Sequence, residues 1–235
     1  VKQRSKTNNS VFVSEQKVYG LNFSGRKLDI AEGFSTHEPN FVCLQEARST
    51  KGSSTFSEYK IESSGHKNHS LGCEVWISYK RPIFAKSPNG SVSKCYIHKH
   101  IVLISTERVL LVLCTTKVGQ LAILNVHGLD SGYKVSDVNT FWDDLYVQVS
   151  NVLPKNAFII LATDANARLS QNGDFLGKHG AEKSNAPGVA FTRFLQNCKL
   201  WVPASYQHSS KDTPQDTKTY YHNSGKMFRN DFICF

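Results

Sequence analysis

The chain has 235 residues, 40% of them hydrophobic, and a formal net charge of +9 at pH 7. This apolar content is enough for a substantial core, which excludes a disordered polyelectrolyte. Residues 1–10 are polar and basic and no apolar stretch of about twenty residues follows, so neither a cleavable leader nor a membrane span is predicted. The positive charge favours a polyanionic partner such as nucleic acid, because lysine and arginine neutralise phosphates.

Short apolar runs recur along the chain and are bounded by turn-forming residues, which is typical of strands. They predict strands at residues 12–13, 18–22, 41–44, 73–79, 101–105, 109–115, 121–126, 158–163, 219–221 and 232–235. We expect one domain over residues 1–235, with a polar lead-in at residues 1–10, because no repeat, long linker or low-complexity tract interrupts the sequence.

Three segments carry apolar residues at helical spacing. The first contains Leu28, Ala31 and Phe34 and ends before Pro39, and the second begins after Ser136 as N-cap and stops before Pro154. The third follows the Pro187-Gly188 pair and carries Phe191, Phe194, Leu195 and Cys198 on one face. Many strands with few covering helices predict two sheets packed face to face, each with an outer helical layer.

The cysteines are scattered, with no close pair that would form a zinc site. They are Cys43, Cys73, Cys95, Cys114, Cys198 and Cys234. Three of them lie inside apolar runs, where a free thiol behaves as a small hydrophobe. This favours an intracellular, reducing compartment, with the nucleus as one candidate, and leaves a secreted, disulfide-bonded form as the alternative.

Acidic side chains end two of the apolar runs. Glu46 follows residues 41–44 and Asp164 follows residues 158–163, so two rigid strands are expected to deliver both carboxylates to one cleft. Glu46 is a hard oxygen ligand of the kind that Mg²⁺ takes, and a surface carboxylate is the alternative. Asp164 and Asn166 are two residues apart, so an extended chain would point both the same way. In that arrangement Asp164 would accept a proton from water, and Asn166 would hold a phosphoryl oxygen. The alternative is a simple Asx turn at the end of the strand.

Further candidates also stand at the ends of predicted strands, and each has an ordinary structural explanation. Asn22 follows residues 18–21 and could simply bend a strand end. His127 follows the apolar run 121–126, where a histidine with satisfied hydrogen bonds is common. Asp231 precedes residues 232–235 and follows Arg229, which suggests a surface ion pair. These residues become candidates for a functional site because of their order along the chain, together with Glu46 and the Asp-x-Asn pair.

That order resembles the motifs of the endonuclease/exonuclease/phosphatase superfamily, the DNase I-like group that includes the endonuclease domains of non-LTR retrotransposons. The resemblance covers residues 19–235. Its motifs are Leu44-Gln45-Glu46, Leu71-Gly72-Cys73-Glu74-Val75-Trp76, Thr163-Asp164-Ala165-Asn166-Ala167 and Arg229-Asn230-Asp231-Phe232-Ile233. The resemblance implies a four-layer α/β/β/α sandwich, an α+β fold of two packed mixed sheets with outer helices, and a phosphodiesterase that uses Mg²⁺ or Mn²⁺.

The resemblance also implies roles at matching positions. Glu46, helped by Asn22, would hold the metal, Asp164 would activate the attacking water, and Asn166 would fix the scissile phosphate. His127 would take the place of a tyrosine of the family, and Asp231 would orient a histidine near the end of the domain. Arg48 resembles an arginine that reaches toward DNA, and an exposed, solvated arginine is its alternative. In retroelement members a linked reverse transcriptase would extend the nicked strand.

Departures from the family pattern keep other functions open. The sequence stops at Phe235, before the family's terminal Ser-Asp-His strand, so we expect a domain truncated at its C-terminal end, whose activity would belong to a longer protein. Thr163 replaces a glycine, and Gly128-Leu129 follows His127 where relatives carry proline. A catalytically degenerate nucleic-acid-binding module of the same fold is one alternative, and a phosphodiesterase acting on lipids or small phosphoesters is another.

Overall fold

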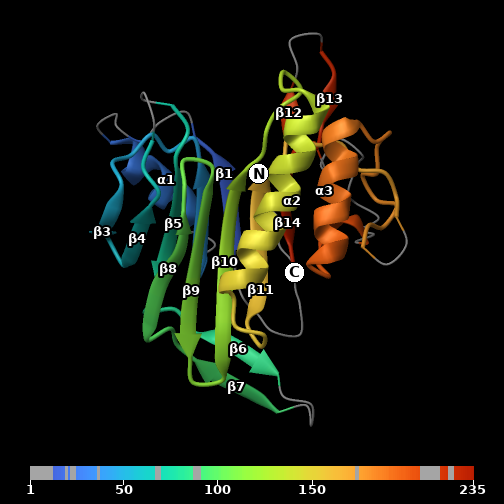
Figure 1. Cartoon of the computed structure of the whole chain (residues 1–235). Coiled ribbons are helices and arrows are strands. Elements are labelled where there is room, and N and C mark those ends of the chain that lie inside the picture. The colour runs from blue at the N-terminus through green and yellow to red at the C-terminus, as the bar shows by residue number, and fades with distance from the viewer. Residues whose placement is uncertain are drawn as a thin grey trace.

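Two five-stranded sheets form the centre of the computed structural model (Figure 1). It describes residues 13–18, 21, 25–35, 38–66, 70–86, 91–172, 175–206, 218–221 and 225–235. The first sheet has the order β1-β2-β5-β4-β3, with bounds Val13–Lys17 (β1), Phe41–Gln45 (β2), Gly52–Phe56 (β3), Tyr59–Ser63 (β4) and Cys73–Ser78 (β5). The second has the order β14-β11-β10-β9-β8, with bounds Lys99–Ser105 (β8), Val109–Thr116 (β9), Gly119–His127 (β10), Phe158–Asp164 (β11) and Asp231–Cys234 (β14).

Both sheets are mixed. β1 pairs with β2 in parallel, as β10 does with β11, whereas the other pairings within the two sheets are antiparallel. The helices are α1 (Arg26–Ser35), α2 (Val135–Val152), α3 (Ala186–Asn197) and the short 3₁₀ helix η1 (Pro203–Ser205). Two hairpins complete the elements: β6 (Ile83–Lys86) with β7 (Val92–Cys95), and β12 (Tyr220–Tyr221) with β13 (Met227–Phe228).

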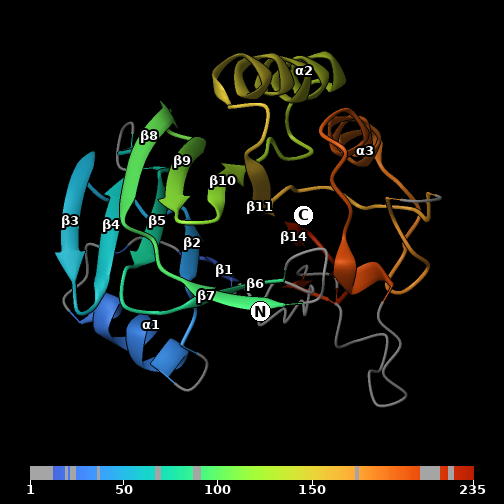
Figure 2. The same cartoon turned by 90° about the horizontal axis from the view of Figure 1, so that it is seen from below.

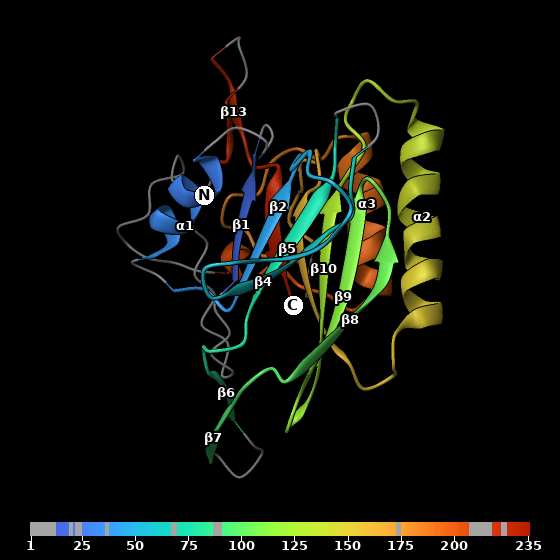
Figure 3. The same ribbon diagram turned by 90° about the vertical axis from the view of Figure 1, so that its left-hand side faces the viewer.

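Three separate apolar cores hold four layers together. Ile30 and Phe34 of α1 pack with Trp76 on the outer face of the first sheet. Alternate strand residues such as Val75 and Ile123 fill the space between the sheets. A third core joins the second sheet to α2 and α3 and includes the Trp142, Phe191 and Phe194 rings. Figures 2 and 3 show the resulting order of α1, first sheet, second sheet, then α2 and α3. The predicted four-layer α/β/β/α sandwich is confirmed.

The strands with buried apolar runs lie where the sequence predicts them. The polar strands give no such signal in the sequence. The sequence gives no signal for β3, because four of its five residues are exposed. It predicts strands at residues 12–13 and 18–22, whereas β1 runs from Val13 to Lys17; residues 12, 19, 20 and 22 lie outside the described residues. β1 was hidden because its buried positions include Ser14 and Glu15.

The predicted N-cap of α2 is wrong. Lys134 takes that position without a side-chain cap, and Ser136 lies in the first turn, where its hydroxyl donates to Asp137. Among the described residues, no helix is both long and apolar enough to cross a membrane.

A buried polar bridge fixes the two sheets relative to one another. Gln45 at the end of β2 donates from Nε2 to Asn125 Oδ1 of β10 at 2.7 Å. Asn125 Nδ2 in turn donates to the backbone carbonyls of Leu44 at 3.1 Å and Glu74 at 2.9 Å. Both side chains are completely buried, so these bonds form in a low dielectric and a shift between the sheets would leave them unpaired. The bridge stands directly beside Glu46, which follows Gln45.

Candidate active site

Three predicted residues meet where strands of both sheets end. Glu46 follows β2 in the first sheet, while His127 and Asp164 end β10 and β11 and are direct partners in their parallel register. His127 Nε2 lies 3.8 Å from Glu46 Oε1 and 3.9 Å from Asp164 Oδ2. The imidazole therefore stands between two carboxylates. Asp164 is only 2% exposed, whereas the Glu46 side chain is 15% exposed at the surface of the site.

Asn166 is held in one conformation beside this group. Its backbone N–H donates to Asp164 Oδ1 at 3.1 Å, and its Nδ2 donates to the Gly128 carbonyl at 3.0 Å. Its φ of 49° lies in the left-handed region, which asparagine tolerates better than most residues. The Asp-x-Asn pair thus forms the turn that the sequence offered as the simple alternative. The turn also holds the Asn166 amide against the Gly128 carbonyl, directly after His127, so the turn does not exclude a role of Asn166 in the site.

Left-handed backbone conformations cluster at this end of the sheets. Besides Asn166, Glu46 and Arg48 each have a φ of 55° and Leu71 has a φ of 64°. Such conformations cost about 1–3 kcal/mol each for ordinary residues and persist where the surroundings enforce them, often at functional sites. The cluster shows that the loops carrying Glu46 and Asn166 are held in unfavourable shapes by their neighbours.

Arg48 turns back toward the site. Its Nη2 lies 3.4 Å from Glu46 Oε2, and its side chain is 37% exposed. In this arrangement the guanidinium neutralises Glu46 rather than extending away from the protein. The contact of Arg48 with DNA stays a prediction.

Two more strands, β14 and β1, bring further carboxyl groups close to Asp164. Asp231 begins β14 and faces Asp164 in the antiparallel register, and its backbone N–H donates to Thr219 Oγ1 at 3.1 Å. Glu15 of β1 is 4% exposed and interacts electrostatically with both aspartates. Burial raises the pKa of the Glu15 carboxyl well above its ordinary value, the charges of Asp231 and Asp164 raise it further, and a hydrogen bond with Gln45 opposes the shift. The Glu15 carboxyl therefore keeps its proton to a higher pH in the folded protein than in the unfolded chain.

This predicts a pH-dependent stabilisation by Glu15→Gln. The pKa of the Glu15 carboxyl is higher in the folded protein than in the unfolded chain. The free energy of unfolding therefore falls as the pH rises from the ordinary pKa of a glutamate toward the raised pKa of Glu15. A neutral glutamine avoids that loss, so the free energy of unfolding at pH 8 should rise by about 1–3 kcal/mol, the cost scale of a poorly satisfied buried polar group. Near pH 4 the substitution should barely change the free energy of unfolding. Urea unfolding in EDTA at both pH values measures this, with the exposed Glu38→Gln as control. An equal effect at both pH values would contradict it.

Asn22, the remaining predicted site residue, lies outside the described residues. The register of β1 places Lys17 opposite Gln45. Val18 N and Leu21 N then donate to the Gln45 and Ala47 carbonyls, each at 2.8 Å. The proposed help of Asn22 in metal binding stays a prediction.

Backbone hydrogen bonds join neighbouring segments around the site, and one of them, from Gly72 N to Glu107 O, connects the two sheets. The bonds, all at 2.8–3.0 Å, are Ala47 N to Gly72 O, Arg48 N to Leu71 O, Gly72 N to Glu107 O, His127 N to Arg108 O, Gly128 N to Asp164 O, and Ala165 N to Asn230 O. We call this set the rim. It means that the loops carrying Glu46, His127, Asp164 and Asp231 are fixed relative to one another, which is what a preorganised site needs.

The side chains at this site offer a divalent cation few ready-made ligands. Within the described residues, no three histidine, cysteine, aspartate or glutamate side chains stand close enough to form a ready-made cage. Mg²⁺ does not require one, because it usually takes one or two carboxylates and fills its other positions with water and substrate oxygens. Glu46, partly exposed and with the Asp164 carboxylate across His127, fits that requirement.

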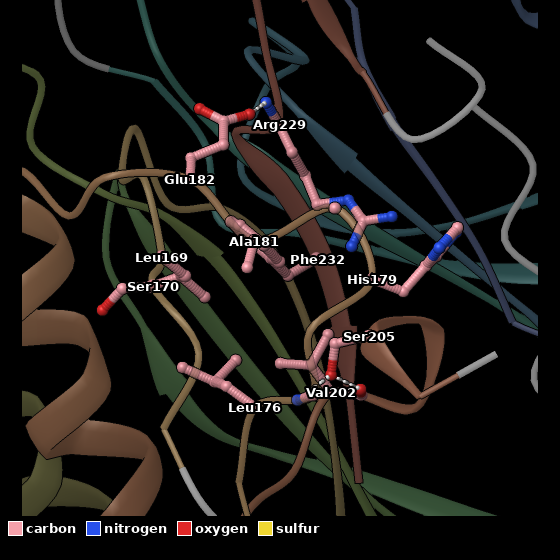
Figure 4. A pocket seen from close by; sticks show the side chains of 12 residues that line it. Leu169, Ser170, Leu176, His179, Ala181, Glu182, Val202, Ser205, Arg229 and Phe232 are labelled. Carbon is pink, nitrogen blue, oxygen red and sulfur yellow. Dashed lines mark hydrogen bonds between the residues drawn. The ribbon is translucent and has the colours of Figure 1, made fainter. Parts of the chain in front are cut away.

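A separate small cavity lies between the start of β14 and the loop before α3 (Figure 4). Its volume of about 10 Å³ offers room for at most one water molecule. Arg229 extends from the Glu182 end of the cavity toward His179, and its backbone N–H donates to Glu182 Oε1 at 3.0 Å. Burial lowers the pKa of the Arg229 guanidinium, and Glu182 opposes this shift. Glu182 also pairs with Lys218, so this cluster anchors the base of the β12–β13 hairpin.

Several residues that shape the site were not predicted. Glu15 lies in a polar segment without an apolar run, and Arg108 lies in a turn. Asn125 carried a usable signal, since a single amide inside an apolar strand has to find a buried partner. Gly128 carried another signal, because it directly follows a strand end: a Cβ built there would lie 2.8 Å from the Ala165 carbonyl oxygen.

All six cysteines are free, and every one except Cys198 is buried.

The layers, sheet orders and site position define a DNase I-like fold, and the resemblance predicted from the motifs is confirmed at the level of fold. No protein-family model and no curated protein matches the sequence. Among solved structures, the chain is similar to the endonuclease domain of TRAS1, a telomere-specific non-LTR retrotransposon. The TM-score is 0.60 at 11% identity, over 96% of this chain and 84% of that chain.

Two further solved structures are similar over most of their length. The AP endonuclease LMAP from Leishmania major has a TM-score of 0.63 at 12% identity, over 95% of this chain and 78% of that chain. The 3′ phosphatase NExo from Neisseria, bound to product DNA hairpin, has a TM-score of 0.61 at 13% identity, over 96% of this chain and 86% of that chain. At these identities the similarity establishes the fold.

Proposed function

We propose that this protein is a divalent-metal-dependent phosphodiesterase that nicks DNA. The observation that carries the proposal is the position of His127 Nε2, within 3.9 Å of the carboxylates of both Glu46 and Asp164, with Asn166 fixed beside them. The fold supports it, since similar structures include endonucleases and a phosphatase bound to DNA. The net charge of +9 suits a polyanionic substrate.

Four residues of the site would each have a part in this hydrolysis. Asp164 would accept the proton of the attacking water, and its Oδ1 accepts the Asn166 backbone N–H, which fixes the orientation of the carboxylate. Asn166 has a second amide hydrogen beyond the one given to Gly128, and it can donate to a phosphoryl oxygen. His127 would contact the same phosphate, and Glu46 would hold Mg²⁺ or Mn²⁺. The bound cation would supply Lewis-acid stabilisation of the charge that develops on the phosphate.

The finer assignment within this proposal is a retroelement-type endonuclease. The nick would leave a 3′ hydroxyl that a reverse transcriptase, covalently linked in a longer parent protein, could extend. Likeness to the TRAS1 domain supports this assignment. An intracellular, reducing location such as the nucleus would suit both a DNA substrate and six free thiols.

A second candidate is a nucleic-acid-binding module of the same fold without turnover. The ion pair between Arg48 and Glu46 favours it, because a guanidinium 3.4 Å from the carboxylate competes with a cation for the same oxygens. Both candidates bind DNA, so they differ only in strand cleavage.

Nicking of supercoiled plasmid tests the proposal. The reaction is run with Mg²⁺, with Mn²⁺ and with EDTA, using this chain and the longer protein where the reading frame continues. Metal-dependent nicking that Glu46→Gln abolishes, and that the exposed Glu38→Gln preserves, is the expected result. DNA binding without nicking by either form would favour the binding module, and undiminished nicking in EDTA would contradict metal dependence.

A further inference from the structure

Arg108 lies in the turn between β8 and β9, outside every motif that the sequence offers. The turn is closed by backbone bonds between Thr106 and Val109, at 2.8 and 3.3 Å, and Thr106 Oγ1 accepts from Arg108 N at 3.4 Å and Val109 N at 3.1 Å. Arg108 is therefore presented from a rigid hairpin. Its own carbonyl accepts the His127 N–H at 2.8 Å, which makes the turn part of the rim.

The guanidinium of Arg108 holds the segment that follows β10. Nη1 donates to the His127 and Gly128 carbonyls, each at 3.3 Å, and Nη2 donates to the Tyr133 hydroxyl at 3.1 Å. The guanidinium also lies over the Tyr133 ring, 5.5 Å from its centroid. A planar group with several fixed donors suits this pattern, whereas the point charge of a lysine does not.

The Gly128 carbonyl connects Arg108 to the site. It accepts from Arg108 Nη1 at 3.3 Å and from Asn166 Nδ2 at 3.0 Å, so one oxygen receives both side chains through its two lone pairs. Gly128 N donates to the Asp164 carbonyl at 2.8 Å. A displacement of Gly128 would therefore move the amide of Asn166.

We infer that Arg108 is a positioning residue for the reaction proposed above: it fixes the His127–Gly128 segment and, through the Gly128 carbonyl, the orientation of Asn166. The inference rests on the proposed function for its effect on rate. It also makes a structural statement, that Arg108 sets the environment of the Asn166 amide, which holds whether or not the chain nicks DNA.

The kinetic test uses Arg108→Gln, Arg108→Lys and, as a matched control, Arg193→Gln. Arg193 pairs with Asp143 on the exposed side of α3, so its loss removes the same charge away from the site. Arg108→Gln is expected to lower kcat about 10–100-fold, since small misplacements at a site cost up to about 10²-fold, with little change in KM. Lysine should not restore kcat, and adding Arg108→Gln to Asn166→Ala should cost little more than Asn166→Ala alone.

The salt dependence of DNA binding separates positioning from direct phosphate contact. The positioning role predicts an unchanged slope of log Kd against log salt in Arg108→Gln. A slope reduced by roughly one, together with rescue by Arg108→Lys, would instead assign Arg108 a phosphate contact and overturn the inference. Additive losses in the double variant would overturn it as well.

A spectroscopic readout keeps the inference testable if the wild type does not nick. The side-chain amide resonances of Asn166 and the backbone amide of Gly128 are compared by ¹⁵N NMR in wild type, Arg108→Gln and Arg193→Gln. Shifts in Arg108→Gln but not in Arg193→Gln support the inference. Unmoved Asn166 resonances in a folded Arg108→Gln protein would overturn it. Should Arg108→Gln fail to fold, the same comparison is made with Arg108→Lys, and unmoved Asn166 resonances there would overturn it.

Discussion

Asp164→Asn is expected to lower the rate of metal-dependent DNA nicking by about 10²–10⁴-fold, the range that a general base contributes. Asparagine has nearly the same shape and keeps an oxygen that can accept the Asn166 N–H, so the turn beside the site should survive. It has no basic oxygen to take a proton from water. The single-turnover rate of supercoiled plasmid nicking is the measurement, with the melting temperature as a check on folding.

Asp143→Asn is the control for this substitution. Asp143 lies on α2 with a side chain that is 53% exposed, and its ion pair with Arg193 is of the surface type that contributes little stability. Its nicking rate should equal that of the wild type. A folded Asp164→Asn protein that nicks at the wild-type rate would remove Asp164 from the mechanism.

Gly128→Ala is expected to abolish most nicking and to destabilise the fold by about 1–3 kcal/mol, the usual cost of forcing an extra methyl into packed surroundings. The added Cβ would lie 2.8 Å from the Ala165 carbonyl oxygen and 3.1 Å from its carbon, and both are backbone atoms that cannot rotate away. The loop after β10 would have to move, carrying with it the carbonyl that receives Asn166. Urea unfolding and plasmid nicking measure the two effects.

Gly33→Ala provides the matched control. A Cβ at Gly33 in α1 would meet nothing within 4 Å, so the substitution should stabilise the helix by about 0.5–1 kcal/mol and leave nicking unchanged. Wild-type stability and activity in Gly128→Ala would show that the loop adapts freely, which contradicts a rigid site.

The strands that are apolar on both faces are the ones that the sequence predicts most readily. β2, β5, β9, β10 and β11 lie between two apolar layers, and their burial leaves a continuous hydrophobic run in the sequence. β3 is an exposed edge and β1 buries Ser14 and Glu15, so neither has that run. Their strands are determined by pairing with neighbours distant in sequence, which local pattern does not encode.

The residues of the candidate site also fall into two groups, those that the sequence could indicate and those that it could not. Glu46, His127 and Asp164 could be proposed because each stands at the end of an apolar strand, where the sequence marks the boundary. Arg108 and Glu15 could not, because their importance arises from contacts with residues of other elements. The ion pair between Arg48 and Glu46 was unpredicted for another reason: both residues have a left-handed backbone, a geometry that sequence spacing alone does not reveal.

The rim has a consequence for how this site adapts to a substrate. Loops are usually the first parts of a protein to open, and their amide protons exchange quickly with solvent. Here the amides of Gly72, His127, Gly128 and Ala165 are bonded across neighbouring loops. They should exchange as slowly as those of the adjoining strands. Accommodation of a ligand therefore falls to side-chain rotation, above all that of Arg48 away from Glu46, while the backbone around the site stays still.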